Sequence, residues 1–142
     1  MVITKSLTFD SAHMLSNYEG KCSNLHGHTY HVLVTIDYQD NVLGNDHMVL
    51  DYNEINKVFK AVDHAIIFSG AGIREQAEDD LLRWAVLNDK ARYVLPDNCK
   101  CTAEDMAQHF AEIIRHMIIS NNCTVMVDLS ETPSANARGV AK

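Results

Sequence analysis

A thiol and three imidazoles lie in the first quarter of the chain and could bind a metal ion. Residues 21–30 read KCSNLHGHTY, so His26 and His28 flank one glycine, Cys22 precedes them, and His13 lies earlier. Side chains alternate across a strand, so His26 and His28 share one face if this segment is extended. An antiparallel return would bring His13 beside them. Three neutral imidazoles with one open position are typical of a catalytic zinc site, although an isolated HxH pair also occurs by chance.

Cys22 has two possible roles, which the spacing alone does not distinguish. As a fourth ligand it would close the metal site and make it structural. As a free thiol above the open position it would be a base or nucleophile, because an adjacent cation and Lys21 both favour the thiolate. Cys99 and Cys101 have no partner pair of the kind that a zinc ribbon needs, and we interpret them as inert loop thiols.

Two acidic positions could take part in proton transfer or ligand binding. Asp63 precedes His64, and a carboxylate beside an imidazole can set its tautomer and raise its basicity. Adjacent helical residues point about 100° apart, so a solvated helix end is the simpler interpretation of this pair. Glu131 follows an apolar strand and could accept two parallel hydrogen bonds from a planar 2-amino-pyrimidinone edge, whereas an isolated glutamate is more often on the surface.

Hydrophobic patterning predicts the elements that must position these residues. Alternation predicts strands over 2–13 and 26–38, a turn over 41–45 and a short strand over 47–50.

Three helices and a last strand complete the pattern. Apolar stripes predict a helix from Asp51 to about residue 63, a second over 75–87 and a third that Thr102 opens. The last strand is predicted over 124–129. This order indicates an α+β fold with helices covering one face of an antiparallel four-stranded sheet.

Length and charge restrict the class of protein. The chain of 142 residues (1–142) is a single domain by length. Its net charge is −7 with no basic cluster, which argues against a nucleic-acid or anionic-membrane surface. The sequence has neither a transmembrane run nor the apolar core of a signal peptide, so we expect a cytoplasmic protein.

Six segments resemble the 6-pyruvoyl-tetrahydropterin synthase family, which includes the 6-carboxy-tetrahydropterin synthases of queuosine biosynthesis. In family order they are FDSAH (Phe9–His13), CSNLHGH (Cys22–His28), MVLDYNEI (Met48–Ile55), VDHAI (Val62–Ile66), CTAEDMA (Cys101–Ala107) and SETPSANA (Ser130–Ala137). The resemblance implies the tunnelling fold (T-fold), in which the sheets of small subunits join into an oligomeric barrel. The expected homo-oligomer is a trimer, or a homohexamer of two stacked trimers, with active sites between subunits.

The resemblance also implies roles for individual residues. The positions of the family's zinc ligands correspond to His13, His26 and His28. Its acid–base residues correspond to Cys22, Asp63 and His64. Its pterin-contacting residues correspond to Glu131 and Thr102.

The implied reaction is the Zn²⁺-dependent conversion of a small-molecule pterin triphosphate, 7,8-dihydroneopterin triphosphate, to 6-carboxy-5,6,7,8-tetrahydropterin. In the reaction that the resemblance implies, the metal would supply Lewis-acid polarisation of the developing carbonyl, and the acid–base residues would move protons at the side-chain carbons as triphosphate leaves. The alternatives are a 6-pyruvoyl-tetrahydropterin synthase, which eliminates triphosphate, and a non-catalytic zinc-stabilised binding module in which Cys22 is a ligand.

The sequence departs from the family pattern in two places. Residues 101–105 read CTAED where the family has Pro-Thr-(Ser/Ala)-Glu-Asn, and a helical segment is inserted at about 65–101. The insertion leaves the identity of the product open. The acidic net charge suits a triphosphate poorly, and Lys21 and Arg138 are the nearest candidates to compensate it.

Overall fold

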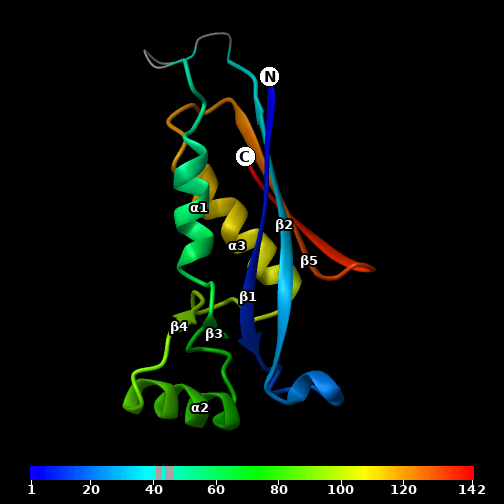
Figure 1. Ribbon diagram of the computed structural model, residues 1–142, viewed down its shortest axis with the longest axis vertical. Coiled ribbons are helices and arrows are strands. Elements are labelled where there is room, and N and C mark those ends of the chain that lie inside the picture. Colours follow the sequence, from blue (N-terminus) through cyan, green and yellow to red (C-terminus); the bar gives the residue numbers. More distant parts are fainter. Residues whose placement is uncertain (41–42, 44–46) are drawn as a thin grey trace.

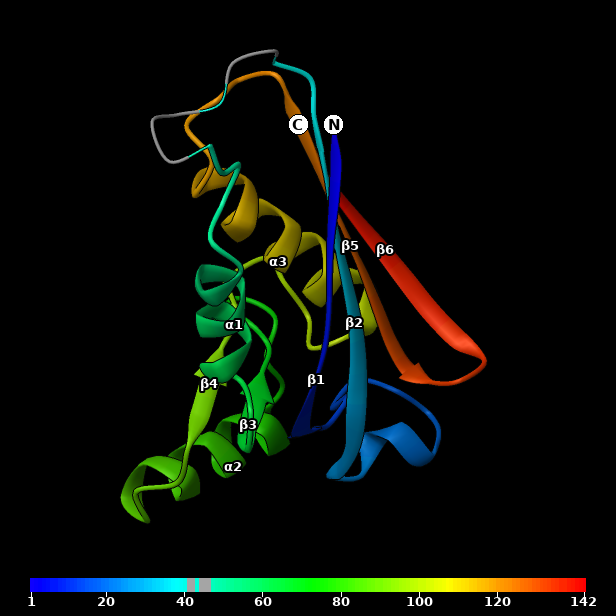
Figure 2. The same cartoon turned by 45° about the horizontal axis from the view of Figure 1, so that its top comes forward.

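The structure, a computed structural model, is a curled six-stranded sheet with two of the three described helices packed on one face and the third beyond one end of it (Figures 1 and 2). It describes residues 1–40, 43 and 47–142. In chain order the elements are β1 (Val2–His13), the 3-10 turn η1 (Lys21–Ser23), β2 (His26–Tyr38), α1 (Tyr52–Lys60), β3 (Ala65–Phe68), α2 (Gln76–Leu87), β4 (Arg92–Val94), α3 (Ala103–His116), β5 (Cys123–Thr132) and β6 (Ala135–Ala141).

The sheet is mixed, with the strand order β4-β3-β1-β2-β5-β6. The pairs β1–β2, β2–β5 and β5–β6 are antiparallel, whereas β3 runs parallel to both β1 and β4. No helix in the described ranges is long and apolar enough to cross a membrane.

Four aromatic rings join the two main helices to the middle of the sheet. Phe9 of β1 and Tyr30 of β2 are opposite each other in register, and their ring centroids lie 4.8 Å apart. Phe59 of α1 lies 5.8 Å from Phe9 and 4.9 Å from Phe110 of α3. Buried rings of this size contribute a large share of core stability. They also fix which face of β1 and β2 is turned toward the helices.

Side-chain caps begin both main helices where the sequence predicts them. Asp51 accepts a hydrogen bond from a backbone N–H in the first turn of α1, and Thr102 accepts one from Asp105 in α3. Such bonds satisfy amide groups that have no partner within the helix. Glu54 does not complete a capping pair with Asp51, because its carboxylate bonds Lys57.

The prediction of four antiparallel strands is wrong. Residues 47–50 form no strand, and the turn predicted over 41–45 lies almost entirely outside the described residues. The strands β3 and β4 have four and three residues, too few to show alternation. The buried or partly buried positions of β6 are the small residues Ala137, Gly139 and Ala141, and the backbone of α3 passes close to Gly139. A Cβ atom on Gly139 would lie 2.2 Å from the carbonyl oxygen of Ala107.

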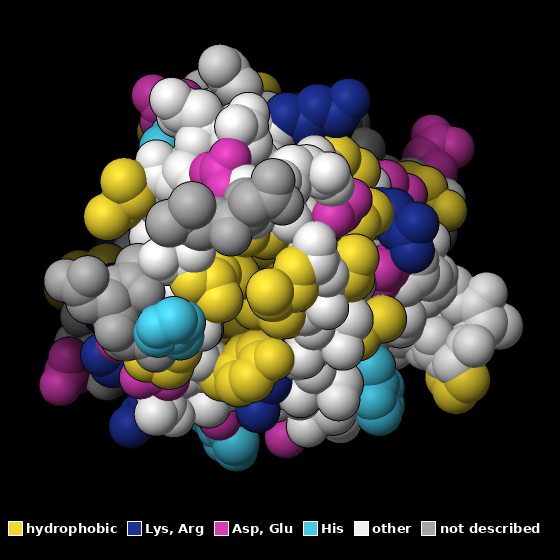
Figure 3. Space-filling view, turned by 90° about the horizontal axis from the view of Figure 1, so that it is seen from above, with side chains coloured by type: hydrophobic (Ala, Val, Ile, Leu, Met, Phe, Trp, Pro, Cys, Tyr) yellow, Lys and Arg dark blue, Asp and Glu magenta, His cyan; other side chains and the backbone are white. Residues whose placement is uncertain are grey.

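The two ends of the molecule differ in character. At the end that carries both termini, hydrophobic side chains gather among scattered charged side chains of both signs (Figure 3). The three histidines lie at the opposite end, where β1 ends and β2 begins (Figure 1).

Candidate metal centre and active site

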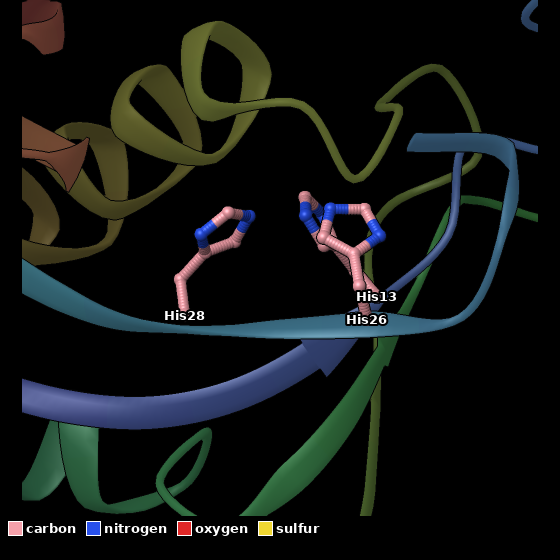
Figure 4. A group of neighbouring side chains, drawn as sticks. All are labelled: His13, His26 and His28. Atoms are coloured by element: carbon pink, nitrogen blue, oxygen red, sulfur yellow. The ribbon is translucent and has the colours of Figure 1, made fainter. Parts of the chain in front are cut away.

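The antiparallel hairpin of β1 and β2 places three histidines on one face of the sheet. Register pairs His13 with His26 and Ser11 with His28. These positions share the parity of Phe9 and Tyr30, so the rings point to the side of the sheet that the helices cover. Figure 4 shows all three rings rising from the hairpin toward the loop that enters α3.

The three rings converge with their Nε2 atoms unused. One ring nitrogen from each histidine lies within 4.8 Å of the others. The Nδ1 atom of His13 lies 2.6 Å from the carbonyl oxygen of Cys101, and that of His26 lies 2.7 Å from the carbonyl oxygen of Asn24. A carbonyl only accepts, so each Nδ1 carries the hydrogen and each Nε2 presents a lone pair.

Within the described part of the chain, the Nε2 atoms of His13, His26 and His28 are all buried and have no hydrogen-bond partner. Three buried polar nitrogens without a partner among the described residues are costly unless a ligand binds them, and two of them, on His13 and His26, present lone pairs. They suit a borderline cation such as zinc, which takes imidazole nitrogens and leaves a further position open with three protein ligands. The residues present therefore fit the metal that the resemblance implies.

Burial keeps His13 neutral, which is the form that binds metal. The side chain is 2% exposed, and desolvation lowers its pKa from 6.5 to about 4. The hydrogen bond to the Cys101 carbonyl acts in the opposite direction, and the neighbouring His26 and His28 lower the pKa further.

The metal-free protein is expected to lose stability as pH falls from about 6.5 toward 4. In that window the unfolded chain binds a proton at His13 that the folded chain does not, so acid favours unfolding. A pKa difference of this size corresponds to about 3 kcal/mol at most. Urea unfolding of chelator-treated protein at a series of pH values measures it.

His13→Gln is the control for this pH dependence. His109 is half-buried, and desolvation lowers its pKa as well, so it adds a slope of its own, which the variant retains. The wild type should therefore lose more stability than His13→Gln over the same pH range. Identical slopes would show that His13 is not the buried titrating group.

Cys22 lies in η1, between the two strands that carry the histidines. Its backbone carbonyl accepts a hydrogen bond from the Leu15 N–H at 2.8 Å, which closes the loop after β1. The thiol is half-buried, and its sulfur is not part of the histidine group. The fold thus brings Cys22 to the same end of the hairpin as the three rings without adding it to the cluster.

Asp63 and His64 form a pair that helical geometry did not lead us to expect. The helix α1 ends at Lys60, and His64 has a left-handed backbone φ of 59° that turns its ring back toward the preceding side chain. As a result Asp63 Oδ1 lies 3.0 Å from His64 Nδ1. The hydrogen bond that Asp63 accepts from the N–H of Asp10 is the main cause that holds its pKa below the usual range. The contact with His64 lowers this pKa further.

The Asp63–His64 pair belongs to a different face of the sheet from the histidine cluster. His64 lines a hollow together with Asp10 and Thr29, whose side chains alternate with those of the clustered histidines, although His28 also borders it. Asp10, Asp63 and His64 lie close enough together to form a group of their own. The imidazole is 77% exposed. A single chain therefore does not direct this pair into the metal centre.

Two other candidates lie close to the cluster. Glu131 stands near the end of β5, and its Oε1 atom lies 3.7 Å from His13 Nε2. Thr102 caps α3 and lines a small pocket that also includes Lys100. Arg138 makes two hydrogen bonds to Asp128, at 2.8 and 3.0 Å, so its guanidinium is already paired.

Some residues at the site were missed in the sequence. Tyr30 is fully buried with an unpartnered hydroxyl, and its ring centroid lies 5.4 Å from that of His28. Tyr30 lies at an even-numbered position of the same strand as His26 and His28, so alternation in the sequence could have placed it on the same face. Cys101 was interpreted as a loop thiol, yet it is buried and its carbonyl orients His13. No sequence pattern marks a backbone carbonyl for that role.

Comparison with known proteins gives concordant matches. The family model described as 6-pyruvoyl tetrahydropterin synthase matches residues 2–140. A 6-carboxy-5,6,7,8-tetrahydropterin synthase from Haemophilus influenzae is 34% identical over 122 residues, which are 80% of this chain and 82% of that protein.

Solved structures show the same fold. The 6-pyruvoyl tetrahydropterin synthase from Plasmodium vivax superposes with a TM-score of 0.61 at 17% identity and covers 100% of this chain and 99% of its own. An uncharacterized protein from Wolinella succinogenes gives a TM-score of 0.70 at 19% identity, with coverage of 100% and 98%.

Proposed function

The chain belongs to the 6-pyruvoyl tetrahydropterin synthase family, and from this membership we propose that it is a zinc-dependent pterin synthase that converts 7,8-dihydroneopterin triphosphate to 6-carboxy-5,6,7,8-tetrahydropterin. The observation that carries the proposal is the convergence of three buried, unpartnered Nε2 atoms at the end of the β1–β2 hairpin. The named activity of the Haemophilus influenzae relative favours this product over 6-pyruvoyl-tetrahydropterin.

Each group at the site has a task in the proposed reaction. A zinc ion held by the three histidines would supply Lewis-acid stabilisation of negative charge that develops on the substrate's oxygen. Cys22 accepts a proton from a side-chain carbon, and His64 transfers protons while Asp63 holds its Nδ1–H and stabilises the imidazolium. Glu131 accepts hydrogen bonds from the planar donor edge of the pterin.

The free edges of the sheet support an oligomer. Among the described residues, β1 pairs with β3 only at Ser11 and Ala12, and β6 pairs with no strand besides β5. Both strands therefore present backbone groups for pairing. Pairing β6 of one copy with β1 of the next would repeat around a ring. The T-fold barrel of the family is a ring of this kind, a trimer or two stacked trimers.

The oligomer would also complete the active site. The Asp63–His64 pair clusters with Asp10, whose side chain alternates with that of His13, so one chain does not direct both groups toward one substrate. We therefore place the site between subunits, with His64 supplied by a neighbouring copy.

Incubation with 7,8-dihydroneopterin triphosphate and identification of the products by mass tests the proposal. The expected products are 6-carboxy-5,6,7,8-tetrahydropterin, triphosphate and acetaldehyde. A product that keeps the whole side chain would instead identify a 6-pyruvoyl-tetrahydropterin synthase. If the protein binds zinc but leaves the substrate unchanged, the remaining alternative is a non-catalytic zinc-stabilised binding module.

Glu131→Gln is expected to weaken substrate binding by about 10- to 100-fold, because losing a charged hydrogen-bond acceptor costs about 1.5–3 kcal/mol. Isothermal titration with substrate measures the change. Metal content must be measured in the same sample, since Glu131 lies 3.7 Å from a ligand nitrogen of His13. Glu54→Gln, on the exposed surface of α1, is the matched control. Wild-type affinity in Glu131→Gln would place the pterin contact elsewhere.

A further inference from the structure

Helix α2, which lies in the inserted segment, carries a buried carboxylate that the proposed reaction does not use. Glu78 is only 1% exposed. Its Oε1 atom accepts the N–H of Ser69 at 2.6 Å, and its Oε2 atom accepts the hydroxyl of Ser16 at 3.1 Å. Among the described residues, no Lys, Arg or His forms an ion pair with Glu78. A buried carboxylate without a cationic partner is costly, so a reason for its presence is needed.

A chain of hydrogen bonds leads from Glu78 to the metal centre. Ser69, whose N–H bonds Glu78, also accepts the N–H of Cys101 on its hydroxyl oxygen at 3.1 Å. The carbonyl of Cys101 in turn accepts the Nδ1–H of His13 at 2.6 Å. The carboxylate therefore holds, through one serine, the backbone of Cys101, the residue whose carbonyl orients a buried histidine of the cluster.

The same carboxylate also holds the loop after β1. Ser16, which donates to Glu78, follows His13 by three residues, and the thiol of Cys101 donates to the carbonyl oxygen of Met14 at 3.1 Å. Three segments distant in sequence are thus joined behind His13.

We propose that Glu78 is a positioning residue for the metal centre, which orients His13 through Ser69 and the Cys101 carbonyl and supplies a buried negative charge that favours a bound cation. The proposal rests on the metal site of the proposed function. Partners of this kind fix the ring orientation of a ligand histidine and raise its basicity. A negative charge in a poorly solvated interior attracts a nearby dication more strongly than one in water.

A purely structural brace and a positioning residue predict different results for Glu78→Gln. Glutamine keeps an oxygen for the Ser69 N–H, and its amide can donate to the Ser16 hydroxyl, so the packing is retained. A neutral amide is easier to bury than a carboxylate without an ion-pair partner, so the metal-free variant should be at least as stable as the wild type. A structural brace predicts no change in zinc affinity, whereas a positioning residue predicts a loss.

The zinc dissociation constant of Glu78→Gln is expected to rise by about 10- to 100-fold, as is usual when a partner of a ligand histidine is removed. Competition with a chromogenic chelator measures it, and urea unfolding of the metal-free protein measures stability in parallel. Asp128→Asn is the matched control. Asp128 is also a buried carboxylate, 9% exposed, but it pairs with Arg138 on the face of the sheet that carries no helix.

Ser69→Ala tests the intermediate link and replaces Glu78→Gln if that variant does not fold. It removes the acceptor for the Cys101 N–H and, like Glu78→Gln, should raise the zinc dissociation constant. The double variant should lose less affinity than the sum of the two single losses, because both act through one chain of contacts.

The outcomes separate this inference from the proposed function. Wild-type zinc affinity in Glu78→Gln, or an equal loss in Asp128→Asn, would overturn the positioning role alone. Failure of the wild-type protein to bind zinc would overturn both the metal site and this inference.

Discussion

Replacing Cys22 with alanine is expected to reduce turnover by about 10²- to 10⁴-fold while zinc remains bound, because a positioned acid or base contributes rate enhancement of that size. The structure supports this separation of roles, since the sulfur of Cys22 is not part of the three-histidine group. Metal content by atomic emission, together with kcat on 7,8-dihydroneopterin triphosphate, measures both quantities on one preparation.

His26→Ala provides the contrast for the Cys22 variant. It removes one of three convergent Nε2 atoms and should lose both zinc and activity. Zinc loss from Cys22→Ala would make the thiol a ligand, and the site would then be the closed, structural kind. Alkylation gives an independent measurement, because a free Cys22 should react rapidly while the metal is retained.

Oligomers that mix Cys22→Ala and His64→Ala chains are expected to recover activity that neither variant has alone. If each site takes Cys22 from one chain and His64 from its neighbour, about one quarter of the sites in an unselected mixture contain both groups, and about one third of the sites do so in trimers that contain both variants. Co-expression of the two variants with different affinity tags, followed by tandem purification, yields the mixed oligomers. Their kcat relative to wild type measures the recovery.

A mixture of Cys22→Ala with a chain that carries both substitutions is the control for this experiment. No site in that mixture contains both groups, so it should stay inactive. If the mixture of single variants also stays inactive, each chain must supply its own His64. The proposal that the site lies between subunits would then be wrong.

Much of the metal centre was predictable from the sequence because strand geometry is local. Once residues 2–13 and 26–38 are recognised as strands, alternation alone places His26 and His28 on one face. The short loop between the strands returns the chain antiparallel, and the observed register pairs His13 with His26 directly. The caps at Asp51 and Thr102 were predictable for the same reason, since a cap bonds residues only two or three positions away.

The rest of the sheet was not predictable because its strands are defined by their neighbours. The strand β3 is a run of four residues that becomes a strand by lying parallel to β1 on one side and to β4 on the other. The strand β6 has small residues dictated by the approach of α3 at Gly139, so it lacks the apolar alternation of a usual strand. Hydrophobic patterning does not detect either constraint.

The Asp63–His64 contact depended on a backbone conformation that the residue types do not specify. Helical geometry separates neighbouring side chains, but the left-handed φ of His64 brings the two groups within 3.0 Å. Its N–H bonds the carbonyl of Asp10, a contact across more than fifty residues. Tertiary packing therefore decided whether this pair exists.

The sequence by itself determined the α+β class, the hairpin that carries His13, His26 and His28, and membership of the family. These features depend on spacing within one or two elements, which alternation and capping encode directly. Only the tertiary structure decided that Cys101 and Glu78 lie behind His13, and that His64 lies on the other face of the sheet. Those relations depend on contacts between segments far apart in the chain, where burial and hydrogen bonding determine which side chains meet.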